Sequence, residues 1–434
     1  MKKTVAFALA MLVLLCACAD SNAFSGGERL SDSVERNTNA AETFNYADGA
    51  AEPPAAYNNY ANVAADFSLK LLRNRFDESA GTAFVCAPAN TMLTLSLLHN
   101  GASDDAKSEL QLQFGGMSAE DLNLCGSYFQ SRLEKVAQTD KDKTAENNNP
   151  LSGEHLSLSQ NLFVNEGFDI TTAFLQNNAD YYGGTIIRSR FAEEGFPGKQ
   201  RALLADYRAN VSFEGETGSC MYAVTASSLA DRWLTPRAVA DGTFKGSSDQ
   251  KTRFMISDEA YLHTDTAEGV VAYTAKNPLK FVAVMPKDNA GLGDYLRKLG
   301  VTELDALLNS MKAGDTVRAA LPQFSIDGGT TAKSLRAPLE KGGLHTLFSN
   351  DAHWKAMDIA DKLRLNNLYE LPPSLTLSAS GVLNTAEQAD AQPMPGEQQQ
   401  VTPKSKKELR FDKPFVFFFI DNESNIPVYA GVYQ

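Results

Sequence analysis

The sequence contains few of the residues on which metal sites and disulfide frameworks depend. Its 434 residues include only five histidines and five cysteines. The histidines are scattered without the short spacing of metal ligands, which disfavours a metal site. After Cys18 only Cys86, Cys125 and Cys220 remain, without a Cys-x-x-Cys pair, so at most one disulfide could form. We expect these three to be small buried side chains.

The short motifs of common enzyme classes are also missing. The chain has no Gly-x-Ser-x-Gly, no His-Glu-x-x-His and no Gly-x-x-x-x-Gly-Lys, which are patterns of hydrolases, zinc peptidases and nucleotide-binding proteins. We therefore expect no catalytic residue, no metal and no cofactor, and a protein that is not an enzyme. A net charge of −13 also disfavours nucleic acid as a partner, because it leaves no broad basic surface.

The hydrophobic run near the N-terminus is too short to be a convincing membrane span. It extends over residues 5–15 and follows two lysines. The next residues, Leu15-Cys16-Ala17-Cys18, resemble the cleavage box of a bacterial lipoprotein signal, in which a small residue precedes a cysteine. This pattern predicts a signal peptide over residues 1–17 and a lipid on Cys18. An ordinary secretory signal is the alternative.

The composition changes again after the signal. Residues 18–58 are rich in Ala, Asn, Ser, Glu and Pro and predict a flexible tether behind the lipidated Cys18. With 43% hydrophobic residues overall, residues 59–434 can form one large domain with a sizeable core. We expect an exported protein that is anchored by lipid to the membrane of the bacterial cell envelope. The choice between the cell surface and the periplasmic face stays open.

The most informative segment lies near the C-terminus. Residues 409–419 read Leu-Arg-Phe-Asp-Lys-Pro-Phe-Val-Phe-Phe-Phe and predict a fully buried central strand. The stretch of about 30 residues before them has almost no large apolar side chain. Instead, residues 393–407 contain three prolines, three consecutive glutamines and three lysines. Such a stretch has too little to bury to offset the cost of ordering, which predicts a long exposed loop.

The C-terminal block resembles the signature of the serpins, and the polar tract stands where serpins carry their reactive-centre loop. Further segments resemble serpin motifs in the same order along the chain. They are Phe84-Val85-Cys86-Ala87-Pro88, Leu156 to Val164, Trp233-Leu234-Thr235-Pro236, Phe281 to Pro286, Leu321-Pro322-Gln323-Phe324 and Leu339-Glu340-Lys341-Gly342-Gly343-Leu344. The resemblance implies an α+β serpin fold with three β-sheets, eight or nine helices and an exposed reactive-centre loop at about residues 381–408.

Several positions depart from the family pattern. Ala87 and Asn90 replace two serines of the turn beneath the main sheet, so the hydrogen bonding there must differ. Arg237 replaces the aromatic residue that follows Trp-x-x-Pro in relatives. The acidic pair before the hinge glycine is replaced by Ala379 and Ser380.

The resemblance also implies a mechanism. In serpins a protease cleaves the loop as a substrate, and the freed N-terminal part inserts into the main sheet before the acyl-enzyme is hydrolysed. Aligning Gly381 with the hinge glycine places Val382, Asn384 and Ala386 on one face of the inserted strand. Residues 381–392 contain no proline, as insertion requires. A buried Asn384 amide would, however, need hydrogen-bond partners.

The scissile bond is harder to place, because the loop is several residues longer than the family pattern. Counting from the hinge reaches Pro395, and counting back from the C-terminal block reaches Pro403. Most serine proteases reject the Met394-Pro395 bond because proline follows the cut. Lys404-Ser405 is therefore our first candidate, for a trypsin-like protease.

Two functions follow from the resemblance. The first is a monomeric protease inhibitor that traps a serine or cysteine protease as a suicide substrate. The alternative is a non-inhibitory surface lipoprotein with a serpin fold that acts as a binding or scaffold protein.

Overall fold

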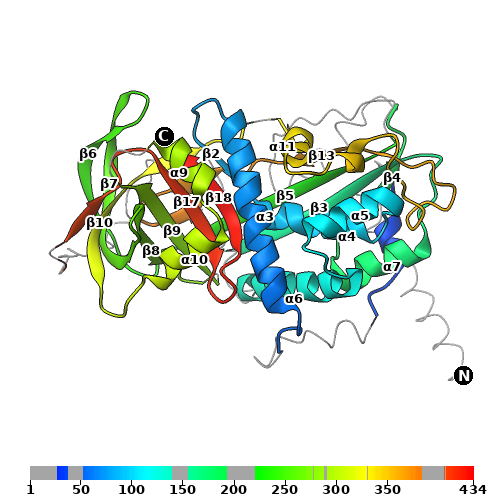
Figure 1. Ribbon diagram of the computed structural model, residues 1–434, viewed down its shortest axis with the longest axis horizontal. Coiled ribbons are helices and arrows are strands. Elements are labelled where there is room, and N and C mark those ends of the chain that lie inside the picture. Colours follow the sequence, from blue (N-terminus) through cyan, green and yellow to red (C-terminus); the bar gives the residue numbers. More distant parts are fainter. Residues whose placement is uncertain are drawn as a thin grey trace, which may run out of the picture.

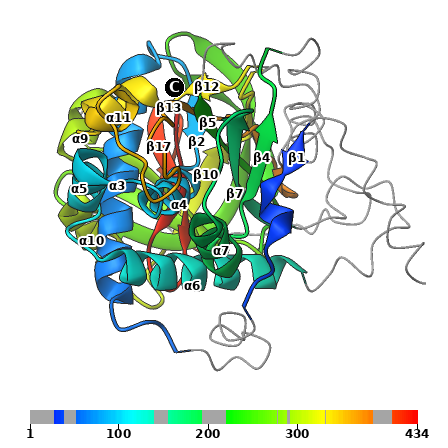
Figure 2. The same cartoon turned by 90° about the vertical axis from the view of Figure 1, so that its right-hand side faces the viewer.

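The structure is a computed structural model that describes residues 27–37, 52–138, 155–192, 220–276, 278–287, 291–329, 331–383, 405 and 407–434. In these residues eight α-helices lie against two large sheets (Figures 1 and 2). The helices are α3 (Tyr57–Glu78), α4 (Pro88–His99), α5 (Asp104–Gln113), α6 (Ala119–Gln138), α7 (Thr172–Tyr181), α9 (Leu292–Lys298), α10 (Val301–Asn309) and α11 (Arg336–Lys341). Short 3-10 turns cover Leu30–Ser33 and Thr346–Phe348.

The first sheet has the strand order β1-β4-β3-β5-β15-β14-β11. β13 pairs with the other end of β5, and β12 pairs with β13. The strands are β1 (Glu28–Arg29), β3 (His155–Asn165), β4 (Thr185–Ser189), β5 (Met221–Arg232), β11 (Phe324–Ile326), β12 (Lys333–Ser334), β13 (Leu365–Glu370), β14 (Leu375–Leu377) and β15 (Gly381–Leu383).

The second sheet has the order β16-β10-β7-β8-β9-β17-β18-β2, with β6 paired to β7. The strands are β2 (Phe84–Cys86), β6 (Ala238–Lys245), β7 (Asp249–His263), β8 (Ala267–Tyr273), β9 (Leu279–Pro286), β10 (Thr316–Pro322), β16 (Glu408–Arg410), β17 (Phe415–Asp421) and β18 (Pro427–Tyr433). The sequence predicts three sheets, whereas the described strands form two hydrogen-bonded sheets. The reason is β7, whose 15 residues pair with β6 and β10 along most of their length and with β8 at their end.

The predicted central strand is confirmed. β17 lies between β9 and β18, and all seven of its residues are buried. Phe415, Phe417 and Phe419 contribute to the largest core cluster, and Val416, Phe418 and Ile420 contribute to a second cluster on the opposite face. Both faces of this strand are therefore covered, which explains why it has no alternation of polar and apolar residues.

Part of the predicted tether is docked on the domain. Residues 27–37, hereafter the N-terminal segment, lie along the outer edge of the first sheet, where β1 pairs with β4 (Figure 2). Leu30 is buried in the main core, and Asp180 on α7 accepts hydrogen bonds from the Asn37 backbone N–H and amide group at 2.8 and 2.7 Å. The prediction of a flexible tether is wrong for these residues, because Leu30 and Asn37 find partners that a composition argument cannot anticipate.

Two successive prolines divide one arm of the first sheet. Pro372 and Pro373 separate β13 from β14, which pair with β12 and β11, respectively. Proline has no N–H to donate to a ladder, so the pairing stops here. A surface cavity of about 500 Å³ lies at the interruption, and its lining includes Arg75, Asp327 and Pro372.

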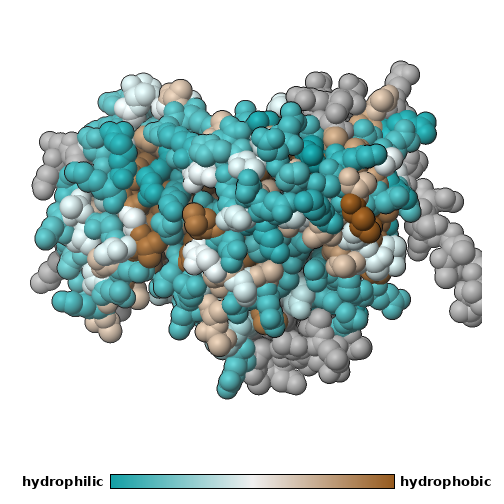
Figure 3. Space-filling view, turned by 45° about the vertical axis from the view of Figure 1, so that its right-hand side comes forward, coloured by the Kyte–Doolittle hydropathy of each residue, from teal (hydrophilic) through white to brown (hydrophobic). Residues whose placement is uncertain are grey.

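The surface is mostly polar, and Figure 3 shows apolar side chains only in small separate patches on the face in view. Among the described residues, no helix has both the length and the hydrophobicity needed to cross a bilayer. Cys86, Cys125 and Cys220 are all free thiols. Cys86 and Cys125 are buried as predicted, whereas Cys220 is half-buried.

Helix α4 is the most deeply buried helix of the domain, since all twelve of its residues are buried. Its last residue, His99, is 1% exposed and lies edge-on to Phe114 at 6.2 Å between ring centroids. Neither ring nitrogen has a hydrogen-bond partner among the described residues. Burial, with a smaller effect of the Lys107 charge, lowers the pKa of His99 to about 4.

This environment predicts a loss of stability in acid. An unfolded histidine has a pKa of about 6.5, so between pH 6.5 and 4 the unfolded chain gains a proton that the folded chain excludes, which costs about 3 kcal/mol. We expect His99→Phe to remove most of this loss. The measurement is the urea midpoint between pH 7 and 4.5, with the exposed His345→Phe as control. An unchanged pH dependence in His99→Phe would contradict the prediction.

Candidate functional site

The hinge of the predicted loop forms a tight hairpin. β14 and β15 are joined by Ala379 and Ser380, and the turn is closed by two backbone hydrogen bonds between Ser378 and Gly381 at 2.9 and 3.2 Å. Ala379 and Ser380, which replace the acidic pair of relatives, form the two-residue tip of this hairpin. The chain therefore reverses direction directly before the loop begins at Gly381.

The first three loop residues already lie in the first sheet. β15 is antiparallel to both neighbours, with Val382 opposite Asp231 of β5 and Leu377 of β14. Val382 and Leu383 are 0% and 2% exposed. Of the predicted hinge residues, Gly381 and Val382 are thus strand residues of the sheet, whereas Asn384 and Ala386 lie outside the described residues.

Gly381 is required by the close approach of β5. A Cβ atom at this position would lie 2.1 Å from the Asp231 carbonyl oxygen and 2.9 Å from the Arg232 Cα atom. Both contacts are with backbone, which cannot rotate away as a side chain can. Only a residue without a Cβ fits between the strands here.

Trp233 connects this hinge to the second sheet. Its indole N–H donates to the Ser378 carbonyl oxygen at 2.8 Å, and its ring meets Phe281 of β9 edge-on at 5.7 Å between centroids. The guanidinium of Arg237 lies over the same ring at 4.2 Å and pairs with Glu259 at 2.8 Å. Burial lowers the pKa of Arg237, and the Glu259 carboxylate opposes this shift. Arg237, which the sequence presents only as a lost aromatic residue, therefore takes a stacking role.

Asn90 ties two strands of the first sheet from beneath. The residue belongs to the first turn of α4, and its amide N–H₂ donates to Ala226 O of β5 at 2.8 Å and Ser159 O of β3 at 3.2 Å. Its Oδ1 accepts a hydrogen bond from Gln160 Nε2 at 2.8 Å. The expected difference in hydrogen bonding at this turn is thus present, because a single amide reaches both strands.

Glu370 compensates for Ala87, which has no side chain that could cap α4. Its Oε1 accepts a hydrogen bond from the Ala87 backbone N–H at 2.7 Å, and the carboxyl group is 1% exposed. Burial raises the pKa of Glu370, while the Arg75 charge and the Ala87 N–H lower it in part. Sequence reasoning missed this residue. A sequence signal was available, because Glu370 follows Leu368 by two residues and therefore lies on the same face of the strand. If Leu368 is buried, this glutamate must be buried too.

The far end of the loop is held on the second sheet. The Ser405 backbone N–H donates to the Asp258 carboxylate at 3.3 Å, and the hydroxyls of Ser405 and Thr316 lie 2.6 Å apart. The Lys407 ammonium lies 3.4 Å from the centroid of the Tyr261 ring. β16 then continues parallel to β10.

Of the four reactive-bond candidates, only Ser405 is described. Met394, Pro395 and Lys404 lie outside the described residues, as does Cys18. The choice of scissile bond therefore stays a prediction.

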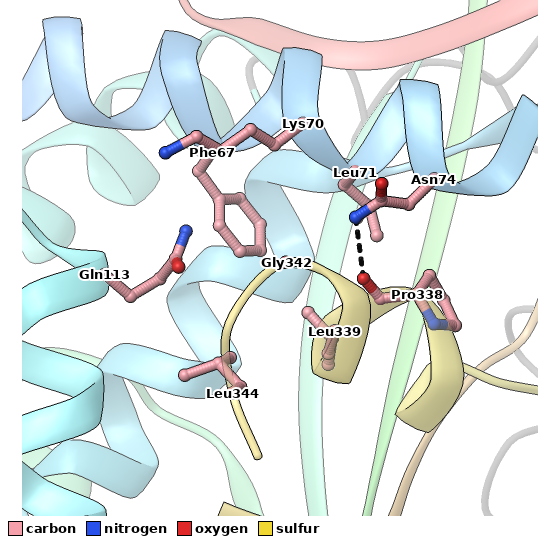
Figure 4. Close-up of a pocket in the computed structure, with 9 residues that line it drawn as sticks. All are labelled: Phe67, Lys70, Leu71, Asn74, Gln113, Pro338, Leu339, Gly342 and Leu344. Carbon is pink, nitrogen blue, oxygen red and sulfur yellow. Dashed lines mark hydrogen bonds between the residues drawn. The ribbon is translucent and has the colours of Figure 1, made fainter.

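Two pockets in the described part of the chain do not change the choice of the loop and its hinge as the candidate functional site. Figure 4 shows one between α3 and α11, where Asn74 Nδ2 donates to the Pro338 carbonyl oxygen at 2.8 Å. Its volume of about 10 Å³ holds roughly one water. The other is the larger cavity beside Pro372. The described residues contain no cluster of three or more His, Cys, Asp or Glu side chains that could hold a metal ion.

Comparison with known proteins identifies the class. A model of the family "Serpin (serine protease inhibitor)" matches residues 62–200 and 217–434, so the chain belongs to the serpin family. Members are in general protease inhibitors rather than enzymes.

The similar proteins are distant in sequence. Alpha-1-antitrypsin 1-2 of Mus musculus is 22% identical over 403 residues, covering 88% of this chain and 89% of the relative. An uncharacterized serpin-like protein of Methanosarcina acetivorans is 21% identical, covering 99% and 97%. The crystal structure of tengpin, a thermophilic serpin, in the native state has a TM-score of 0.74 at 21% identity, covering 94% and 98%. At these identities the structural likeness establishes the fold.

The glycine at the hinge can be tested directly. We expect Gly381→Ala to push residues 381–383 out of the sheet, because the added methyl group would collide with the backbone of β5. Hydrogen exchange at the amides of Val382 and Leu383 should then become fast. The matched control is Gly300→Ala, where a Cβ would meet no atom within 4 Å. Retained protection in Gly381→Ala would refute this account.

Removing the Asn90 amide beneath the first sheet should destabilise the protein. Asn90→Ala leaves the Ala226 and Ser159 carbonyls without their side-chain donor and the Gln160 amide without its acceptor, which should cost about 1–3 kcal/mol. Thermal unfolding followed by circular dichroism measures the loss. Asn74→Ala, which removes one hydrogen bond away from the sheet, is the control. Equal destabilisation by both substitutions would show that the position beneath the sheet has no special role.

Proposed function

We propose that this protein is a lipid-anchored serpin of the bacterial cell envelope that inhibits a serine or cysteine protease by suicide-substrate trapping. The observation that carries the proposal is the position of Gly381, Val382 and Leu383. They occupy the start of an additional strand between β5 and β14, antiparallel to both. For the loop residues that follow to extend this strand along β5, β13 must separate from Met221 to Thr225, with which it pairs.

The chemistry requires only the protease and the loop. The protease nucleophile attacks the carbonyl carbon of the residue before the scissile bond, the amine of the next residue leaves, and an ester or thioester joins the two proteins. Extension of β15 along β5 then moves the attached protease before water hydrolyses that bond. The burial of further loop residues and their new backbone hydrogen bonds provide the driving force.

The alternative is a serpin-fold scaffold that does not inhibit. It is favoured by the loop composition, because Asn384 and Gln388 would need polar partners if their strand were buried. It is also favoured by the loop length, which gives hydrolysis more time before insertion is complete. These features affect the rate of trapping rather than the fold.

One assay separates the two functions. The soluble domain from Ala19 onward is mixed with trypsin-like, elastase-like and papain-like proteases and analysed on denaturing gels with mass spectrometry. We expect a covalent band at the summed mass of domain and protease, and a large rise in the melting temperature of the cut domain. Cleavage between residues 392 and 407 without such a band, at every protease ratio, would favour the scaffold.

The same assay tests the reactive bond. If Lys404-Ser405 is cut, Lys404→Ala should abolish the complex with trypsin-like proteases, because their substrate pocket requires a basic side chain. Ser405 must first leave Asp258 and Thr316, so Thr316→Ala should speed cleavage at this bond. A complex that survives in Lys404→Ala would move the reactive bond elsewhere in the loop.

A further inference from the structure

The strand registers place the N-terminal segment and the hinge at opposite ends of the first sheet. Arg188 of β4 pairs with Glu28 of the N-terminal segment and with Val164 of β3, and Val164 pairs with Met221, the first residue of β5. The hinge pairs with the last two residues of β5, Asp231 and Arg232. In Figure 1, β4 and α7 lie at one end of the long axis.

Insertion of the loop would therefore carry its cut end towards the N-terminal segment. β15 enters beside Arg232 and points towards Met221. The 12 residues of β5 correspond to a path of about 40 Å at about 3.3 Å per residue. A protease joined to the loop would finish its movement at the end of the sheet where β1 lies.

The N-terminal segment is held at that end by several kinds of contact. Leu30 is 7% exposed in the main core, and Asp180 binds Asn37 through both of its carboxylate oxygens. Arg188 donates to Glu28 Oε2 at 3.1 Å through its Nε atom. A Cβ on Gly27 would lie 2.5 Å from the Arg188 carbonyl oxygen, so the segment fits closely against β4.

The length of chain outside the N-terminal segment limits how far the domain can stand from its anchor. Nine peptide steps separate Cys18 from Gly27, and they span at most about 30 Å. A protease domain of about 230 residues has a radius of gyration of about 17 Å and a diameter of about 45 Å. The anchor therefore leaves less space between membrane and domain than a trapped protease needs.

We propose that the N-terminal segment is a releasable membrane clamp. While docked, it holds the β4–α7 end of the domain against the membrane and directs the β16 end outward, towards an approaching protease. It must detach before the trapped protease can occupy the membrane-facing end. This inference rests on the proposed lipid anchor and trapping function.

Detachment lengthens the connection. From Cys18 to Tyr57, where α3 begins, the chain has 39 peptide steps, and their maximum reach is about 130 Å. The average reach of a flexible coil would about double, since it grows with the square root of length. The strength of docking thus sets how often an anchored molecule completes trapping.

The test uses the chain from Cys18 onward with Cys220→Ser, coupled through Cys18 to a maleimide lipid. Cys86 and Cys125 are buried and should not react. Coupling replaces the natural lipid, so the result does not depend on processing in the cell. The variants are Leu30→Asp, which breaks the docking, and Asp180→Ala, which removes the partner of Asn37. Glu166→Gln is the control, because its ion pair with Arg190 lies outside the N-terminal segment.

Two measurements decide the outcome. Neutron reflectometry on a supported bilayer should give a water gap of at most about 30 Å for the parent and the control, and a wider gap for Leu30→Asp and Asp180→Ala. On vesicles, the number of loops cut per covalent complex should be several-fold higher for the parent than for Leu30→Asp, and equal when both are free in solution. Equal gaps, or equal ratios on vesicles, would overturn the proposal. Absence of any complex in solution would instead reject the trapping function, and the water gap would still test the clamp.

Discussion

The contact between the N-terminus of α4 and the underside of the first sheet is the constraint to which the other elements are fitted. Asn90 joins β3 and β5 from below, and Glu370 of β13 binds the first free N–H of the helix at Ala87. α4 is buried along its whole length, packed among α3, α6, β3, β5 and β18. All of these elements pack against one helix. A change in the spacing of β3 and β5 above Asn90 must therefore alter the packing of the other elements as well.

The two sheets have different mechanical roles. In the second sheet, β17 is covered on both faces by apolar side chains, and its register with β9 and β18 is continuous over most of its length. The first sheet instead holds the three residues of β15 between β5 and β14, and the Trp233 indole, directly after β5, donates to the Ser378 carbonyl oxygen, directly after β14. The second sheet thus has a central strand paired on both sides, whereas the first sheet holds β15 over only three residues.

Much of this fold could be predicted from the sequence, and the reasons are local. The Phe-rich run of β17 has a composition that only a buried strand tolerates, and the serpin-like segments Leu156 to Val164 and Phe281 to Pro286 lie within β3 and β9. The prediction of the hinge at Gly381 depended on family spacing, and the close approach of Asp231 now gives it a physical cause.

The remaining features depend on contacts between residues far apart in the chain. Glu370 and Ala87 are separated by 283 positions, so no local pattern announces that one caps the other. The docking of residues 27–37 depends on Asp180 and Arg188, which lie on elements formed much later in the sequence. The fusion of two expected sheets follows from the length of β7, whose ends serve different neighbours.

The interruption at Pro372 and Pro373 has a consequence for how the first sheet bends. Because Pro372 and Pro373 have no N–H, the hydrogen-bonded arm formed by β13 and β14 is interrupted between the two strands. Bending of this arm is therefore concentrated at the two prolines. β14, which follows the prolines, belongs to the hairpin that contains Gly381. β13, which precedes them, keeps its register with Met221 to Thr225. Motion of β14 and the hairpin can therefore be absorbed at Pro372 and Pro373 before it reaches β13.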